Sequence, residues 1–115
     1  MANDRELITR AVRDYFEGWY DADTARMDRA LHRDLVKRSP TSGLGAILTK
    51  EQMLTFTAEG EGTKVAADRR LEIDIADVCG DIASVVVRSA PYREYLHMVR
   101  TGDGWQIVNG LWLPR

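Results

Sequence analysis

Apolar side chains recur at helical spacing near the start of the chain. From Leu7 to Tyr20 they fall three and four residues apart, which is typical of a helix with one buried face. Asn3 and Glu6 have the spacing of a capping box, so we expect the helix to begin there. Gly18 lies inside this pattern, where glycine costs about 1 kcal/mol relative to alanine. We therefore expect another segment to approach the helix closely at Gly18.

Two shorter helices and a short strand are predicted between residues 23 and 60. Asp23 is placed to cap a helix that reaches about Leu31. A strand follows over residues 35–38 and ends at Ser39 and Pro40, and residues 40–48 form a loop. Thr49 and Gln52 then have capping-box spacing, and they open a third helix with Met53 on its apolar side.

After residue 70 the pattern changes to alternation of apolar and polar residues, which predicts strands. Tight turns at residues 79–81 and 101–104 separate them. The strands expected are residues 70–78, 82–89, 93–100 and 105–113. Three helices followed by antiparallel strands predict an α+β fold in one domain, residues 1–115, with the helices packed on one face of a curved sheet.

Composition narrows the classes of partner. The 115 residues carry a net charge of -2, which argues against nucleic acid or an anionic membrane as a partner held by charge. No apolar run has the roughly 18 residues of a membrane span, and the N-terminus has no signal-peptide core. Cys79 is the single cysteine, so we expect a cytoplasmic protein without disulfides. No metal site and no cofactor are expected, because ligand clusters are missing from the sequence.

Several segments resemble a known family. They are residues 15–20, 26–27, 30–38, 94–99, 104–109 and 111–112. They resemble the small bacterial proteins described as "putative lumazine-binding", within the nuclear transport factor 2-like superfamily, which includes ketosteroid isomerases and SnoaL-type polyketide cyclases. The resemblance implies a cone-shaped fold with a ligand-binding pocket between the first helix and the concave face of the sheet. It also implies a homodimer formed through the convex face.

The resemblance to ketosteroid isomerases covers only part of their chemistry. Their tyrosine that donates a hydrogen bond to an oxyanion matches Tyr15. Their general-base aspartate falls on Ser39, and their second acid falls near Tyr95. This sequence therefore lacks both carboxylates at those positions, and steroid-type isomerisation by that route is not expected.

A different set of polar residues is predicted to face the pocket. Because side chains alternate along a strand, an inward Ser39 places Lys37 and Leu35 inward, and an inward Tyr95 does the same for His97. Histidine changes its protonation near neutral pH, so His97 suits acid–base chemistry. The candidate catalytic residues are therefore Tyr15, Lys37, Tyr95 and His97. The candidate ligand-binding residues are Trp19, Leu35, Met53, Asn109 and Arg93, the last at the mouth.

The register of the last hairpin decides one of these assignments. Either Arg100 or Val99 lies opposite Trp105, and a slip of one residue reverses every side chain. We expect the second register, which turns Asn109 toward the pocket. Trp112, Val108 and the alternating valines at 85 and 87 then lie on the outer face, where a second copy of the chain would cover them.

Three functions remain open from the sequence. One is a cofactor-independent isomerase, cyclase or dehydratase that acts on a carbonyl compound. The second is a non-catalytic carrier or sensor of an aromatic or anionic small molecule, and the third is a dimerisation module with a filled core. Structural roles explain the same residues, since Trp19 has core spacing, His97 can be a hydrogen-bonded strand residue, and Lys37 can extend to solvent.

Overall fold

The computed structural model describes residues 3–115. In chain order its elements are α1 (Asp4–Asp21), α2 (Thr24–Ala30), β1 (Leu31–Arg38), the 3-10 turn η1 (Pro40–Ser42), α3 (Lys50–Ala58), the 3-10 turn η2 (Glu61–Val65), β2 (Leu71–Cys79), β3 (Ile82–Ser89), β4 (Tyr92–Thr101) and β5 (Gly104–Pro114). The expected order of helices and strands is confirmed. The first strand begins earlier than expected, directly after α2, and η2 was not predicted. None of the helices between residues 3 and 115 has the length and apolar character that a bilayer crossing requires.

Both predicted helix starts are capped by a side chain, but only the second has a complete capping box. The Asn3 side chain accepts a hydrogen bond from the Glu6 backbone N–H at 2.9 Å, at the start of α1. Thr49 and Gln52 exchange reciprocal bonds at the start of α3. These local contacts satisfy backbone donors that the first helical turn leaves free, which is why the sequence alone located both helix starts.

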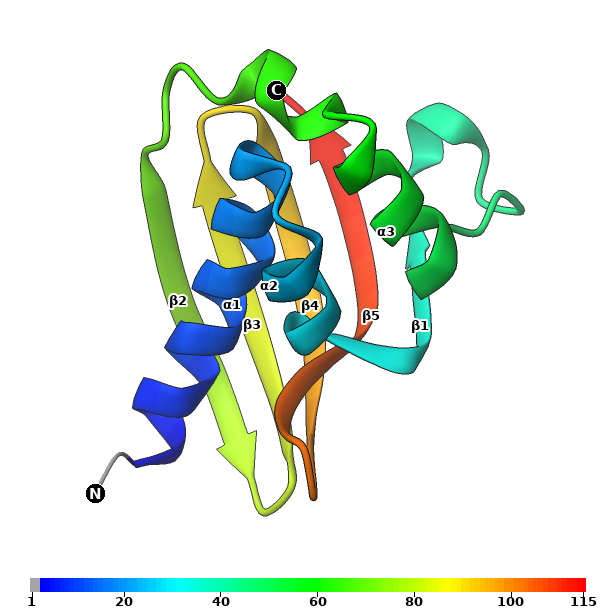
Figure 1. Ribbon diagram of the computed structural model, residues 1–115. Coiled ribbons are helices and arrows are strands. Elements are labelled where there is room, and N and C mark those ends of the chain that lie inside the picture. The colour runs from blue at the N-terminus through cyan, green and yellow to red at the C-terminus, as the bar shows by residue number, and fades with distance from the viewer. Residues whose placement is uncertain (1–2) are drawn as a thin grey trace.

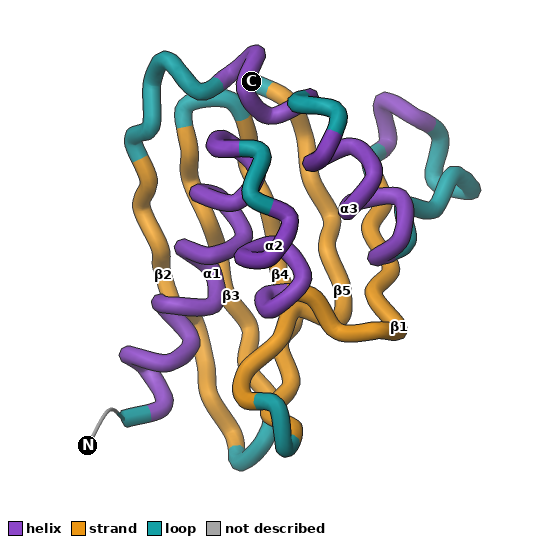
Figure 2. The backbone as a smooth tube through the Cα atoms, viewed as in Figure 1, coloured by secondary structure: helices purple, strands orange, loops and turns teal. Residues whose placement is uncertain are grey.

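The five strands form one sheet in the order β1-β5-β4-β3-β2. The pairs among β2, β3, β4 and β5 are antiparallel, whereas β1 lies parallel to β5. The sheet is therefore mixed: the antiparallel arrangement expected for the strands after residue 70 is confirmed, and β1 adds one parallel pair. A hairpin turn makes neighbouring strands antiparallel, but most of the chain separates β1 from β5, so no turn constrains this pair. Figure 1 and Figure 2 show the three α-helices on one face of the sheet.

The core lies between α1 and the concave face of the sheet. Phe16 and Val12 of α1 are buried there, together with Leu96 of β4. Val85 and Val87 are also buried, at 1% and 0% exposure. The expectation that these two valines cover the outer face was therefore wrong, because the helices cover the side of β3 on which they lie.

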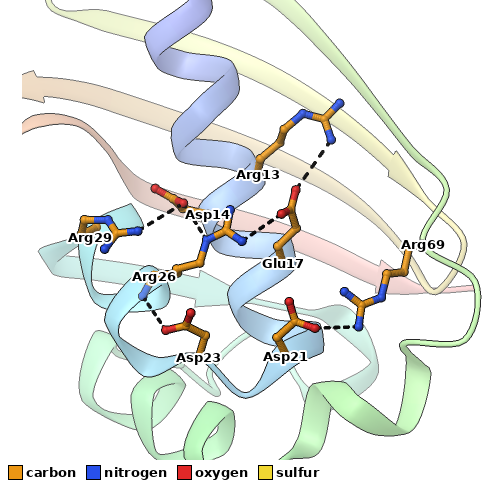
Figure 3. Close-up of polar contacts among 8 residues, drawn as sticks. All are labelled: Arg13, Asp14, Glu17, Asp21, Asp23, Arg26, Arg29 and Arg69. Carbon is orange, nitrogen blue, oxygen red and sulfur yellow. Dashed lines mark hydrogen bonds and ion pairs between the residues drawn. The ribbon is translucent and has the colours of Figure 1, made fainter.

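A close approach and a set of ion pairs join α1 to α2. A Cβ atom on Gly18 would lie 3.0 Å from the Met27 backbone nitrogen, which confirms the predicted close contact at this glycine. Arg26 binds the carboxylates of Asp14 and Glu17, each at 2.9 Å (Figure 3). The Arg26 guanidinium therefore holds α2 against two successive turns of α1.

The end of α1 is fixed by η2 and the loop after it. A Cβ atom on Gly62 would lie 2.0 Å from the Trp19 carbonyl oxygen, so only glycine fits there. Arg69 pairs with Asp21 at 2.7 Å (Figure 3). These contacts fix the turn of the helix that carries Trp19.

A bulge interrupts the hairpin of β4 and β5. Near the turn Arg100 pairs with Trp105, but beyond the irregularity His97 pairs with Asn109, so Val108 is the extra residue. The register that we expected was wrong. Close to the turn the first alternative holds, with Arg100 opposite Trp105. Beyond Val108 the pairing is displaced by one residue from that register, in the direction opposite to the displacement that we expected.

Candidate functional site

A cavity of about 360 Å³ lies between α1, α3 and the sheet. Most of its walls are aromatic or aliphatic, and three charged side chains interrupt them. The aromatic residues are Tyr15, Phe16, Trp19, Phe56, Tyr92 and Trp112, the aliphatic ones are Leu48 and Met53, and the charged ones are Lys37, Glu61 and Glu94. A cavity of this volume accommodates a small organic molecule.

Three buried polar side chains meet in the wall of this cavity. Tyr15 comes from α1, Lys37 from β1 and Glu94 from β4, and each is at most 4% exposed. The Tyr15 hydroxyl donates to both Glu94 carboxylate oxygens at 3.1 Å, and it accepts a hydrogen bond from Lys37 Nζ. Lys37 Nζ also lies 3.5 Å from Glu94 Oε2. We call these three residues the buried triad.

Burial changes the acidity of two members of the triad. It raises the pKa of Tyr15 well above its ordinary value, and the nearby Glu94 carboxylate raises that pKa further. Burial lowers the pKa of Lys37, although the attraction of Glu94 acts in the opposite direction. The triad therefore combines a proton donor with a lysine that loses its proton more readily than one in water.

Aromatic side chains surround the triad. Trp19 Nε1 donates to the Tyr92 hydroxyl at 3.2 Å, and the Tyr92 ring meets Trp112 edge to face at 5.5 Å between centroids. Lys37 Nζ lies 5.7 Å from the centre of the Trp112 ring. The buried Trp112 Nε1 has no hydrogen-bond partner among residues 3–115, so this tryptophan of the lining carries an unused N–H donor.

A glycine in β5 makes room for the lysine. Gly110 pairs with Lys37, and a Cβ atom there would lie 3.0 Å from Lys37 Cγ. The lysine stem therefore runs over the β5 backbone before its ammonium group reaches Tyr15 and Glu94.

Four of the residues singled out from the sequence line the cavity. Tyr15, Lys37, Trp19 and Met53 are there. Leu35 is buried in the core and is not part of the cavity wall. The placement of Lys37 follows the predicted alternation, since Ser39 is also buried, at 2% exposure.

The other four candidates lie elsewhere, and their predicted placement was wrong. Tyr95 is 49% exposed, and His97 is also exposed. Arg93 lies two residues from Tyr95 in β4, on the same face of the sheet, and does not line the cavity. Asn109 pairs with His97, its Nδ2 atom lying 3.4 Å from His97 Nδ1. Because Glu94 and Leu96 point inward, alternation turns these neighbours outward.

Sequence reasoning missed Glu94 and Trp112. The alternation of apolar Leu96 and Met98 with His97 contains the signal for Glu94, because it places even-numbered residues of this strand inward. The carboxylate of Glu94 therefore lines the cavity, although Ser39 and Tyr95 stand at the two positions where ketosteroid isomerases carry acids. Trp112 carried no such signal, because counting from Ile107 turns it outward unless Val108 is recognised as a bulge.

A second hollow of about 570 Å³ shares no residue with the first cavity. It is lined by residues that include His32, His97, Cys79, Asp77 and Asn109. No group of three or more His, Cys, Asp or Glu side chains within residues 3–115 is arranged to hold a metal ion. This hollow therefore offers no built metal site.

Comparison with known proteins identifies the fold and a family. The family described as "Putative lumazine-binding" matches residues 3–113. The chain matches none of the curated proteins with which it was compared.

Crystal structures of low sequence identity share the fold. A nuclear transport factor 2-like protein of unknown function from Silicibacter pomeroyi has a TM-score of 0.71 at 18% identity, over 95% of this chain and 93% of that one. A nuclear transport factor 2-like protein from Cytophaga hutchinsonii has a TM-score of 0.70 at 17% identity, over 99% and 100%. The S. rosetta CaMKII hub has a TM-score of 0.70 at 12% identity, over 100% and 99%. The chain therefore has the fold that these nuclear transport factor 2-like proteins share.

Proposed function

This chain belongs to the family described as "putative lumazine-binding", in the nuclear transport factor 2-like superfamily, and we propose from this premise that its cavity binds a small planar aromatic molecule with a carbonyl group. The observation that carries the proposal is a cavity lined by six aromatic residues with the buried triad in its wall. Aromatic walls favour flat ligands, and a few polar groups fix their orientation.

The free hydrogen-bond donors of the cavity favour a ligand that accepts hydrogen bonds. Trp112 Nε1 is buried without a partner. A lysine ammonium has three N–H donors, and Lys37 directs two of them to Tyr15 and Glu94. We propose that the third N–H and the indole N–H bind carbonyl oxygens or ring nitrogens of a ligand.

The charges of the lining favour a neutral ligand over an anion. Lys37 is balanced by Glu94 at 3.5 Å, and Glu61 adds a second carboxylate. Lys64 pairs with Glu61 at 3.0 Å, but both side chains are solvent-exposed, and such pairs are screened. An anionic ligand would meet no unpaired cation among the described residues that line the cavity.

Quenching of tryptophan fluorescence tests this proposal directly, because Trp19 and Trp112 line the cavity. The probes are lumazine, 2-naphthamide and 2-naphthoate. We expect saturable quenching by lumazine or 2-naphthamide, and weaker binding of the carboxylate. Trp112→Phe removes the free N–H and should weaken binding of the neutral probes, whereas Leu44→Ser, in the exposed loop, should not. Absence of saturable quenching by all three probes would contradict the proposal.

Acid–base catalysis is a second candidate, favoured by the meeting of three titratable groups at one point. Glu94 would accept a proton from the carbon next to a ligand carbonyl, and Tyr15 and Lys37 would donate hydrogen bonds to the enolate. The test follows exchange of the α-protons of 2-tetralone in deuterated water by NMR. Exchange that is accelerated by the protein and lost in Glu94→Gln supports it, provided that the variant still unfolds cooperatively in urea. Exchange at the rate of buffer alone refutes it for this substrate.

The outer face of the sheet leads to a proposal about assembly. Ile82, Tyr95, Leu111 and Leu113 lie on this face and are between 45% and 61% exposed. We propose that a second copy of the chain covers them in a homodimer, because exposed apolar side chains that are grouped on one surface mark interaction sites.

A further inference from the structure

We propose that Lys37 captures a carbonyl ligand covalently, as an imine between Nζ and the carbonyl carbon. This inference rests on the proposed binding of an aromatic carbonyl compound, and it adds a chemical step to that binding. It assigns to the cavity a class of substrate, aromatic aldehydes and ketones, and a reaction that non-covalent binding does not include.

The position of Lys37 carries the proposal. Its side chain is 5% exposed, yet it lines the 360 Å³ cavity. A carbonyl compound bound there would have its reacting carbon near the amine, and such confinement replaces a bimolecular encounter. Tyr15 and Glu94 lie beside the same nitrogen, so proton donors and acceptors are present where imine formation needs them.

The surroundings also favour the reactive form of the amine. An amine attacks a carbonyl only when it is unprotonated, and burial lowers the pKa of Lys37. Glu94 can take the proton at 3.5 Å, which converts the buried ion pair into two neutral groups. Transfer of that proton creates no net charge in the cavity.

The step balances with these residues alone. Lys37 passes one proton to Glu94, and its lone pair then forms the C–N bond while the carbonyl π electrons move to oxygen. The oxygen takes a proton from the attacking nitrogen and gives a carbinolamine. Glu94 then protonates this hydroxyl, the C–O bond breaks, water leaves, and the nitrogen lone pair forms C=N. The iminium cation remains beside the regenerated Glu94 carboxylate, and no oxidant or reductant is needed.

The other lysines provide internal controls. The chain contains only Lys50 and Lys64 besides Lys37. Lys64 is 67% exposed, and Lys50 donates hydrogen bonds to the carbonyls of Asp28 and Leu31. Neither lines the cavity. A reagent that reacts by exposure alone would label Lys64 before Lys37.

Reductive trapping tests the proposal. The protein is incubated with 2-naphthaldehyde and sodium cyanoborohydride, and the labelled residue is located by peptide mass spectrometry. Binding is followed separately by tryptophan quenching with 2-naphthamide, which has a similar shape but forms no imine. We expect one naphthylmethyl group, mainly on Lys37, and loss of that label when 2-naphthamide is in excess. Lys64→Arg should retain the label, and Lys37→Arg should lose it.

The outcomes separate this inference from the proposed function. Quenching by 2-naphthamide with no label, or with label spread over Lys50, Lys64 and the N-terminal amine, would overturn imine formation and leave binding intact. Absence of saturable quenching by lumazine, 2-naphthamide and 2-naphthoate would overturn both imine formation and the proposed binding. The decisive mapping uses the wild-type chain, so it does not depend on the folding of Lys37→Arg.

Discussion

At the scale of single residues, the buried triad joins stability to function. Lys37 and Glu94 are almost fully removed from water, at 4% and 3% exposure. Removing two charges from water is costly, and each of these charges is compensated mainly by the other. The site therefore depends on a pair whose members cannot be changed singly without a large loss.

A first prediction concerns this pair. Lys37→Met should lower the free energy of unfolding by roughly 3–5 kcal/mol, because the Glu94 carboxylate is left buried without its counter-charge. Lys64→Met, at the exposed pair with Glu61, should cost no more than about 1 kcal/mol. Urea unfolding measures both. Equal effects would show that burial of the first pair has no energetic consequence.

A second prediction concerns alkaline pH. Burial raises the pKa of Tyr15, so above the ordinary tyrosine value of about 10 the unfolded chain releases this proton and the folded chain retains it. Stability is therefore lost as pH rises above about 10. The lowered pKa of Lys37 has the opposite effect. Below about pH 10.4 the unfolded chain holds the lysine proton more tightly than the folded chain does, so this group adds stability as the pH rises toward that value.

Tyr15→Phe separates these two effects. The variant lacks the tyrosine proton, so its free energy of unfolding should fall less steeply than that of the wild type between about pH 9.5 and pH 11. Urea unfolding across this range measures the slopes. Parallel pH profiles for the two proteins would contradict a raised Tyr15 pKa.

At the scale of elements, close backbone approaches place the helices around the cavity. The 3-10 turn η2 presses Gly62 against the Trp19 carbonyl, and the bulge at Val108 turns Trp112 of β5 toward Glu94 of β4, with which it pairs. Two irregular segments therefore bring two tryptophans to the same cavity.

A third prediction tests η2. Gly62→Ala should cost about 1–3 kcal/mol, because the added methyl group would lie 2.0 Å from the Trp19 carbonyl oxygen and force η2 away from α1. Its tryptophan emission should also change, since Trp19 lines the cavity. Gly102→Ala is the control, because a Cβ atom there has no neighbour within 4 Å. A Gly62→Ala protein with wild-type stability would show that η2 moves freely.

At the scale of the whole molecule, the two faces of the sheet have different roles. The helices cover one face of the sheet (Figure 1), and residues of α1, α3 and the sheet line the cavity. The outer face presents Tyr95 and Leu111, which pair across β4 and β5 and remain about half exposed.

A fourth prediction concerns assembly. We expect sedimentation to give the mass of two chains, and Leu111→Glu to shift the protein toward one chain, because a charge buried at an interface lacks a partner. Leu44→Glu is a matched control, since Leu44 is 61% exposed in a loop outside the sheet. A wild type that sediments as a single chain would rule out the homodimer.

Local sequence determined much of the architecture. The helix starts at Asn3 and Thr49 depend on residues three positions apart, and the close approach at Gly18 follows from a glycine inside a helical pattern. These features are set by neighbours in the chain, so the sequence contains all the information that they require.

Only the tertiary structure decided which polar residues meet. The pairing of β1 with β5 brings Lys37 beside Gly110, and one bulge residue reverses the faces of Asn109 and Trp112. Strand parity can be read from a sequence only while the alternation is regular, and a single inserted residue inverts it without a distinctive local signal. Tyr15 and Lys37 were therefore predictable as pocket residues, whereas their junction with Glu94 depends on contacts between segments that are far apart in the chain.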